Sequence, residues 1–175
     1  MGIQESTEEY RAALRMGQKQ YKDLVAAGKD PYPAVLDDIL PGQANEYQTQ
    51  TIGVADIPAN LVVGTRSAGR TNAFTAGFLP LLAAGSEFSV KWIRLCDAHL
   101  SDEGIRDPIE CFEYMGKFYV QEGNKRVSVL RYFGSPAITG TVKRILPPKS
   151  DDPQIIAYYE FLEFYDASKL YDIRF

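Results

Sequence analysis

Residues 117–134, KFYVQEGNKRVSVLRYFG, decide the fold. Phe118-Tyr119-Val120 is aromatic and β-branched, a composition that favours a short β-strand. Gly123-Asn124 then interrupts the strand, and asparagine is well suited to accept the free N–H groups at the start of a helix. Apolar residues follow with helical spacing until Gly134, a typical helix-ending residue. The stretch therefore predicts a strand, a tight turn and a helix.

Two cations fall in the first turn of this predicted helix, Lys125 and Arg126. A helix N-terminus carries partial positive charge, so each cation there costs roughly a few tenths of a kcal/mol. A bound anion would remove the conflict. Free N–H groups, the permissive Gly123 and two basic side chains together favour a phosphate-sized site. The alternative is a solvated turn whose basic side chains point into water, and the motif alone leaves both open.

The composition describes an ordinary globular chain with an acidic balance. Its 175 residues suit one domain with a substantial core, and 45% hydrophobic with 24% charged residues argue against disorder. The net charge of -4 and the pI near 5.1 argue against a surface that coats duplex DNA or anionic membrane. A local basic pocket in such a chain fits a small anionic ligand better.

Cys96, Cys111 and the single His99 lack the spacing of a zinc site. No nucleophile motif accompanies His99, which argues against a catalytic triad. We expect both thiols to be buried and free. The polar N-terminus lacks the apolar segment of a signal peptide, and no apolar run approaches the roughly 20 residues that cross a bilayer. We therefore expect a soluble cytoplasmic protein, and the abrupt, apolar C-terminus leaves open that it is one domain of a longer chain.

The remaining patterns predict alternating helices and short strands. We expect an N-terminal helix and strap over 1–50 and a domain over 51–175, in one compact unit. The predicted elements are a helix over 5–28 capped by Ser6 or Thr7, a Pro- and Gly-rich strap over 30–47, strands at 51–54 and 61–64, a helix near 72–83, a helix from Ser86 to Leu100, a hairpin over 108–120, a strand over 137–146 and a final helix from Asp151.

Arg66 and Arg70 lie in the small-residue turn that follows the second predicted strand. The planar guanidinium fork matches phosphate geometry, so both side chains are candidates for the same pocket. The alternative, which each arginine alone favours, is an exposed residue paired with nearby acids.

Residues 107–146 resemble the ParB/sulfiredoxin-like superfamily. The resemblance rests on Asp107-Pro108-Ile109, the strand at Phe118, the turn Glu122–Arg126, its helix and the strand from Ile138 to Leu146. The segment from Ile57 to Phe74 is similar to the family's first strand and its arginine-bearing turn. The resemblance covers half to two-thirds of the chain and depends on feature order more than on identity. It implies an α+β fold of this type, with a small mixed β-sheet, flanking helices and an added N-terminal helix.

The resemblance also implies a nucleotide site and excludes one activity of the superfamily. In the superfamily a turn of this kind cradles nucleotide phosphates. Sulfiredoxins place a reactive cysteine before the histidine and arginine of the turn, where this chain has Asn124 and Lys125, so it is not a sulfiredoxin. Partition proteins bind CTP there and contact DNA through a following helix-turn-helix domain, which this sequence does not show. Free-serine kinases of the superfamily use acidic residues near the turn, where Glu122 stands.

We therefore expect a nucleotide-binding domain for ATP or CTP, with Mg²⁺ bridging the phosphates. Gly123, Asn124, Lys125 and Arg126 are expected at the phosphates, with Arg70 and Arg66 in support. Glu122 would hold the metal or orient an acceptor if hydrolysis or phosphoryl transfer follows.

A second reading is a nonenzymatic interaction or regulatory domain that keeps the fold. The aromatic-rich final helix, the long first helix and the abrupt, still apolar C-terminus motivate it, with a homo-oligomer or a protein partner as its consequence. A third reading, DNA binding or nicking, conflicts with the acidic pI and with the lack of Lys and Arg among the aromatic residues.

Overall fold

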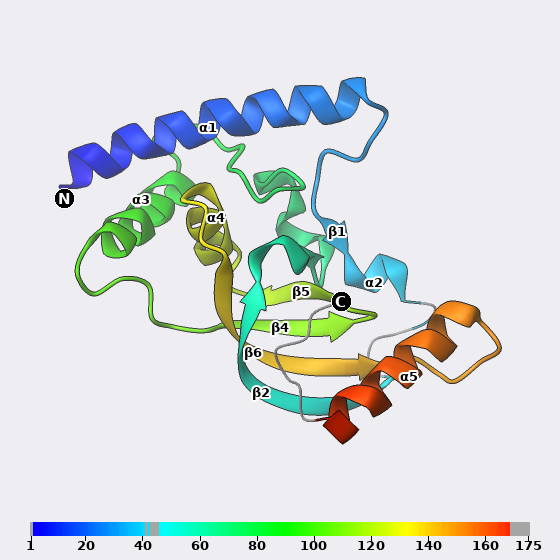
Figure 1. Cartoon of the computed structure of the whole chain (residues 1–175). Helices are drawn as coiled ribbons and strands as arrows, with labels where there is room; N and C mark the ends of the chain where they lie inside the picture. Colours follow the sequence, from blue (N-terminus) through cyan, green and yellow to red (C-terminus); the bar gives the residue numbers. More distant parts are fainter. Residues whose placement is uncertain (1, 41, 43–45, 169–175) are drawn as a thin grey trace.

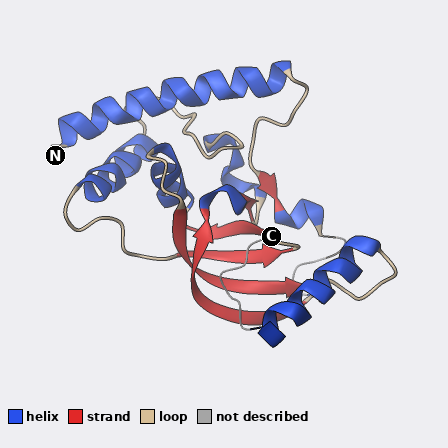
Figure 2. Cartoon of the chain, in the orientation of Figure 1, coloured by secondary structure: helices blue, strands red, loops and turns tan. Residues whose placement is uncertain are grey.

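The computed structural model is an α+β fold in which helices flank one mixed six-stranded sheet, as Figures 1 and 2 show. It describes residues 2–40, 42 and 46–168, without the side chains of residues 70, 167 and 168. The helices are α1 (Ile3–Ala26), α2 (Leu36–Ile39), α3 (Glu87–Leu100), α4 (Asn124–Tyr132) and α5 (Pro153–Ser168), and the strands are β1 (Ala34–Val35), β2 (Gln48–Pro58), β3 (Val62–Thr65), β4 (Ile109–Tyr114), β5 (Lys117–Glu122) and β6 (Ala137–Leu146).

The strand order is β1-β3-β5-β4-β6-β2, so both parallel and antiparallel neighbours occur. β4 and β5 form an antiparallel hairpin around the turn Met115-Gly116, and β2 pairs antiparallel with β6 along the outer edge. β3 runs parallel to β5, and β4 runs parallel to β6. Helix α4 is the crossover that carries the chain from β5 to β6. In Figure 1, α1, α3 and α4 lie together on one side of the sheet, and α5 lies near the opposite end of β6.

The core has three connected parts, set by the two-residue alternation of the strands. On one face, Cys111, Val120 and Val142 pack with Val127 of α4. On the other face, Tyr119 of β5 packs with residues of α2 and β6. The third part joins the helices and is formed by Tyr10, Ala13, Trp92, Cys96 and Val129. The start of α4 is therefore held from two sides, by the sheet and by α3.

The strand, turn and helix predicted from residues 117–134 are confirmed. The hairpin, the strand at 137–146 and the final helix are confirmed as well. Ser86 caps α3 as expected, because its Oγ accepts a hydrogen bond from the N–H of Ser89. Both cysteines are buried and free. Burial and the nearby Glu113 carboxylate raise the pKa of the Cys111 thiol to about 12, so it stays protonated and is a poor nucleophile.

The helix predicted near 72–83 is wrong. The chain forms a 3-10 turn over Ala68–Ala73 and then an irregular segment. Phe74 and Phe78 in this segment are both buried, and their spacing of four residues imitates a helical stripe. The side chain of Thr75 accepts a hydrogen bond from the N–H of Leu79 and donates one to Gln20 of α1. Contacts with α1 thus set this segment's conformation.

Two further expectations near the N-terminus are wrong. Neither Ser6 nor Thr7 caps α1, since the helix begins earlier with Gly2 as its N-cap and Ser6 lies buried inside it. The strands predicted at 51–54 and 61–64 have other bounds in the structure. β2 is much longer and continues to Pro58, and β3 covers Val62–Thr65. The strap contributes a strand that the sequence did not suggest, β1, which pairs parallel with β3.

In the described part of the chain, none of the helices combines the length and the apolar character that crossing a membrane requires.

We predict that Gly17→Ala destabilises the protein although alanine is the better helix former by about 1 kcal/mol. A Cβ at Gly17 would lie 2.2 Å from the Pro80 carbonyl oxygen, so α1 would have to move away from the 74–86 segment. We expect a loss of about 1–3 kcal/mol in the free energy of unfolding, measured with urea. Gln18→Ala, at an exposed position, should change it by less than about 0.5 kcal/mol. A Gly17→Ala variant as stable as the wild type would contradict the close packing of α1.

A second prediction concerns His99, whose ring centroid lies 4.9 Å from that of Phe133. Burial lowers its pKa, so the unfolded chain binds a proton more readily than the folded one. Stability should therefore fall as the pH drops below about 6.5, the usual pKa of histidine. As the only histidine, its NMR signal should titrate with a midpoint below that value. A midpoint at or above 6.5 would show that the ring is not buried.

Candidate functional site

A cavity of about 770 Å³ opens at the junction between β5 and α4. Its walls come from the end of β3, the 65–74 turn, the first turns of α3 and the predicted Glu122–Arg126 turn. β3 and β5 are parallel neighbours, and both end at this cavity. Ligands commonly bind beyond the carboxyl ends of parallel strands, where helix N-termini also gather. The structure thus places the sequence motif at a concavity.

Gly123 gives the turn its shape. Its φ of 109° and ψ of 24° lie in the left-handed region, and it is the N-cap of α4. A Cβ at this position would lie 2.7 Å from Cγ2 of Ile109, so the turn is packed against the start of β4. Gly123 has no side chain, so the N-cap residue gives the helix no side-chain cap. The first-turn N–H groups of a helix have no acceptor within it, and the residues that carry them here line the cavity.

The expectation that Asn124 caps the helix is wrong, because it is the first helical residue and Gly123 takes the capping position. Asn124 lines the cavity, and its Oδ1 is buried without a hydrogen-bond donor among the described residues. Leaving a buried polar atom unsatisfied costs about 1–3 kcal/mol. A hydroxyl or amino group of a ligand would satisfy this oxygen.

Lys125 and Arg126 both line the cavity, but they are held differently. Nζ of Lys125 lies 5.4 Å from the ring centroid of Phe88, a cation–π contact with α3. Nη1 of Arg126 donates hydrogen bonds to the carbonyl oxygens of Asp107 at 3.0 Å and Pro108 at 2.8 Å. Arg126 therefore ties the start of α4 to the segment before β4, and its charge is only partly available to a ligand.

Glu122 ends β5, lines the cavity and lies opposite Glu110 in the hairpin register. Two carboxylates facing each other across a strand pair are unfavourable, and a cation nearby would relieve the repulsion. The described residues contain no group of three or more Asp, Glu, His or Cys side chains placed to hold a metal ion. A magnesium ion here would therefore need oxygen ligands from a bound phosphate as well, which is its usual mode of binding.

Arg66 is the predicted site residue that the structure does not bring to the cavity. Its Nη1 donates to Oε1 of Gln121 at 2.9 Å, and its guanidinium carbon lies 5.2 Å from the ring centroid of Phe112. Phe112 packs on the face of the sheet opposite α4. The backbone of Arg70 lies in the 3-10 turn between two lining residues, Gly69 and Asn72, but its side chain is outside the described part of the structure.

Several lining residues were not predicted from the sequence. Helix α3 contributes Glu87, Phe88 and Lys91, and the 65–74 turn contributes Asn72. Nζ of Lys91 lies 3.0 Å from Oε1 of Glu87, so these two charges largely compensate each other. On the sequence, Glu87 and Lys91 fall on the polar side of an amphipathic helix. Only the packing of α3 against α4 reveals that they border the cavity.

Comparison with known proteins does not assign this chain to a family. No family model matches it, no curated protein matches it, and no solved structure matches it. The resemblance to the ParB/sulfiredoxin-like superfamily therefore stays a prediction from the residues.

We predict that Gly123→Ala distorts the site. The change puts a Cβ against Ile109 and forces a non-glycine residue into the left-handed region, so the free energy of unfolding should fall by about 2–4 kcal/mol. Gly69→Ala is the matched control, since Gly69 lines the same cavity with open space around its Cα. Urea unfolding of both variants measures the difference. Equal stabilities would contradict the constraint assigned to Gly123.

Proposed function

We propose that the protein binds the phosphates of a nucleotide, ATP or CTP, in the cavity at the start of α4. One observation carries the proposal: Lys125 and Arg126 line a cavity of about 770 Å³ at the N-terminus of a helix whose N-cap residue is a glycine. The helix dipole, the N–H groups and the cations all favour an anion at this point. The volume falls within the range of small-molecule sites.

The cavity walls suit the other parts of a nucleotide. Phe74, Phe88 and Leu95 give one region an apolar lining on which a base can pack. The unsatisfied Oδ1 of Asn124 is an acceptor for a ribose hydroxyl or an exocyclic amino group. In this arrangement Lys125 leaves the ring of Phe88 to meet the phosphates, while Arg126 keeps the turn in place through its two carbonyl contacts.

Mg²⁺ would neutralise phosphate charge, and Glu122 would help to hold it, because the other lining carboxylate, Glu87, is paired with Lys91. Phosphoryl transfer depends on positioning and charge neutralisation, for which Lys125 and the α4 N-terminus are suited. If turnover occurs, we assign to Glu122 the orientation of an acceptor hydroxyl or water. The resemblance to the ParB/sulfiredoxin-like superfamily supports the same roles for the turn.

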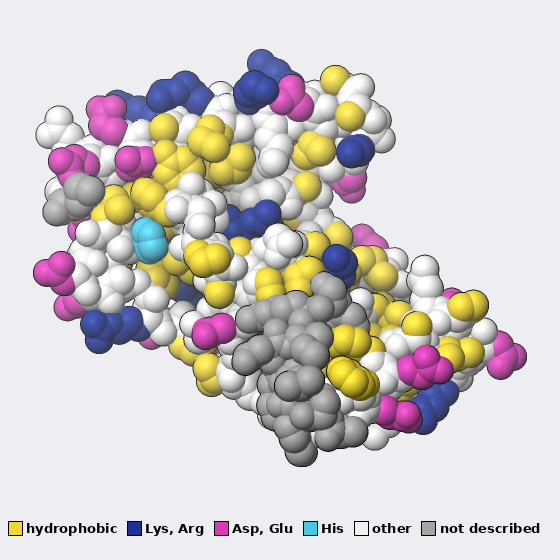
Figure 3. All heavy atoms as spheres, viewed as in Figure 1, with side chains coloured by type: hydrophobic (Ala, Val, Ile, Leu, Met, Phe, Trp, Pro, Cys, Tyr) yellow, Lys and Arg dark blue, Asp and Glu magenta, His cyan; other side chains and the backbone are white. Residues whose placement is uncertain are grey.

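A small ligand fits the surface better than a nucleic acid does. On the face drawn in Figure 3, acidic and basic side chains are interspersed, and the chain carries a net charge of -4. Binding to a nucleic acid backbone needs a continuous basic surface.

The second candidate, an interaction domain, is favoured by α5. Ile156 is 45% exposed and Phe164 is 53% exposed on this helix. Apolar side chains of this size on a helix surface are suited to contact with a protein partner or a second copy. The two functions are compatible, because none of the described side chains of α5 lines the cavity at α4.

We predict that the protein binds ATP or CTP with Mg²⁺ in calorimetry and that Lys125→Ala weakens binding about tenfold, which equals about 1.4 kcal/mol. Lys125 is the sharper choice, because removing Arg126 would also break its bonds to Asp107 and Pro108. Binding should weaken as salt is raised.

Lys149→Ala is the matched control, since Nζ of Lys149 lies 5.0 Å from the ring centroid of Tyr159 in a similar cation–π contact outside the cavity. It should bind like the wild type. The proposal is wrong if the wild type binds neither nucleotide at about 1 mM. A dissociation constant of that size corresponds to a binding free energy of about 4 kcal/mol. Equal losses in Lys125→Ala and Lys149→Ala would show that binding does not occur at α4.

A further inference from the structure

A second cavity, of about 300 Å³, lies between α5 and the outer strands of the sheet. It shares no described lining residue with the cavity at α4. Its walls are mainly apolar and come from β2, β4, β5, β6 and α5, with Ile52, Phe118, Val142 and Phe161 among the apolar lining residues. Small-molecule sites combine such walls with a few fixed polar groups.

A large apolar side chain beside this cavity is partly in water. Ile52 of the edge strand β2 lines the cavity and is 39% exposed. The side chain of Val54 faces the other side of the sheet, because Val54 pairs with Thr141. An apolar molecule in the cavity would cover part of Ile52 and would be favoured by the hydrophobic effect.

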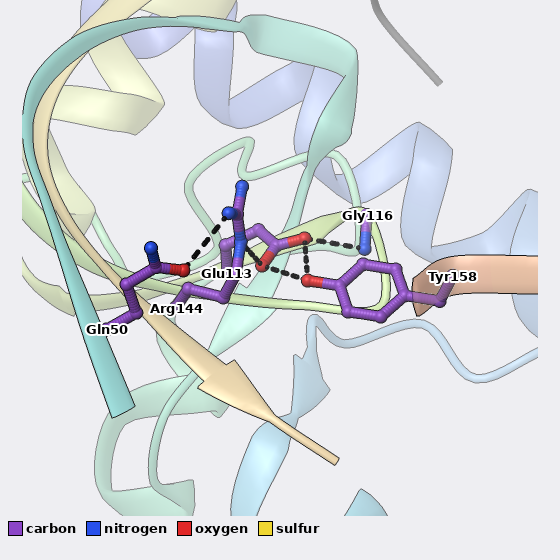
Figure 4. A network of polar contacts seen from close by, with 5 residues as sticks. All are labelled: Gln50, Glu113, Gly116, Arg144 and Tyr158. Carbon is purple, nitrogen blue, oxygen red and sulfur yellow. Dashed lines mark hydrogen bonds and ion pairs between the residues drawn. The ribbon is translucent and has the colours of Figure 1, made fainter. Parts of the chain in front are cut away.

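The polar part of the wall is a fixed network, drawn in Figure 4. Glu113 is 2% exposed and accepts hydrogen bonds from the N–H of Gly116, the hydroxyl of Tyr158 and Nε of Arg144. Burial and the Glu113 carboxylate raise the pKa of Tyr158, so its hydroxyl keeps the proton that it donates. Both oxygens of Glu113 therefore already accept hydrogen bonds, and three donors use most of the acceptor capacity of this carboxylate.

Arg144 retains donors. Its side chain is 17% exposed; Nε lies 3.0 Å from Glu113 Oε2, and Nη1 makes only a long contact of 3.5 Å with Oε1 of Gln50. In Figure 4 the remaining nitrogen, Nη2, points away from both partners, and the structure gives it no hydrogen bond within the described residues. Arg144 lines the cavity, so these N–H groups are the ones that a ligand acceptor can reach.

The charges of the lining decide which acceptor fits. Glu113 and Arg144 face the same side of the sheet, and the carboxylate already neutralises the guanidinium at 3.0 Å. Asp56 faces the other side, where its Oδ1 accepts a hydrogen bond from Thr139, so it does not add to the charge of the cavity. A carboxylate ligand would therefore bring an uncompensated negative charge into a partly buried site, which is unfavourable. A neutral carbonyl oxygen accepts the same hydrogen bond without that cost.

We propose that this cavity binds a neutral, mainly apolar small molecule whose carbonyl-type oxygen accepts a hydrogen bond from Arg144 and whose apolar part lies between Phe118, Val142 and Phe161. The site is separate from the nucleotide site, and neither proposal depends on the other.

Four matched probes test the ligand chemistry: 2-acetylnaphthalene, 2-naphthoate, 2-naphthylmethylamine and 2-ethylnaphthalene. Titrations of the ¹⁵N-labelled whole chain, followed by NMR, should show saturable shifts around Phe118 and Val142 with 2-acetylnaphthalene. We expect it to bind at least about fivefold tighter than the carboxylate or the hydrocarbon, a difference of about 1 kcal/mol. Tighter binding of the carboxylate or the amine, shifts confined to other regions, or no saturable shift would overturn the proposal.

Phe161→Ala tests the location, because it removes the apolar wall that α5 contributes to the cavity. It should weaken 2-acetylnaphthalene at least about fivefold. Phe164→Ala is the matched control, since Phe164 is 53% exposed on the same helix and lines neither cavity. Arg144→Lys keeps a positive partner for Glu113 but loses the second donor arm, and it should remove the preference for the ketone over the hydrocarbon. Unchanged affinity in Phe161→Ala, or an unchanged preference in Arg144→Lys, would refute the assignment.

Discussion

The contact between Gly123 and Ile109 is the constraint on which the site depends. The turn between β5 and α4 must enter the left-handed region and pass so close to β4 that no Cβ fits. These two conditions leave only glycine at this position. They also fix where α4 begins, and hence where its N-terminus and its first two cations point. The cavity exists because α3 and the 65–74 turn surround that point.

The two cations of the turn are held differently, and the proposed site gives them different roles. Arg126 is bonded to the carbonyl oxygens of Asp107 and Pro108, which holds α4 to the entry of β4. Lys125 rests on the ring of Phe88, a contact worth about 0.5–1 kcal/mol at an exposed site. A phosphate would compete with the ring for Lys125 but has no need to displace Arg126. The sequence motif therefore combines an anchoring residue with an adaptable one.

The sequence was most informative where local signals suffice. The glycine, the basic pair and the apolar spacing of residues 117–134 predicted the strand, the turn and α4, and Ser86 predicted the start of α3. The prediction of a helix near 72–83 is wrong. Phe74 and Phe78 have helical spacing, but the hydrogen bonds of Thr75 to Gln20 and Leu79 give the segment another backbone path. Strand β1 is only two residues long, too short to leave a pattern.

The candidate site was predictable on one side only. Glu122 to Arg126 are contiguous and carry their own chemical signal, whereas Phe88 and Lys91 join them through the packing of α3 on α4. Arg66 looked equivalent to Arg70 on the sequence, but its bond to Gln121 and its contact with Phe112 take its side chain elsewhere. The cavity beneath α5 had no sequence signal, since it arises where a helix meets the edge of the sheet.

A crystal structure of the protein grown with ATP or CTP and Mg²⁺ tests the central claim most directly. The account predicts electron density for a phosphate group within hydrogen-bonding distance of the backbone N–H groups at the start of α4, with Nζ of Lys125 moved from Phe88 toward that phosphate. Nucleotide density elsewhere on the molecule, with Lys125 still on the ring of Phe88, would contradict it.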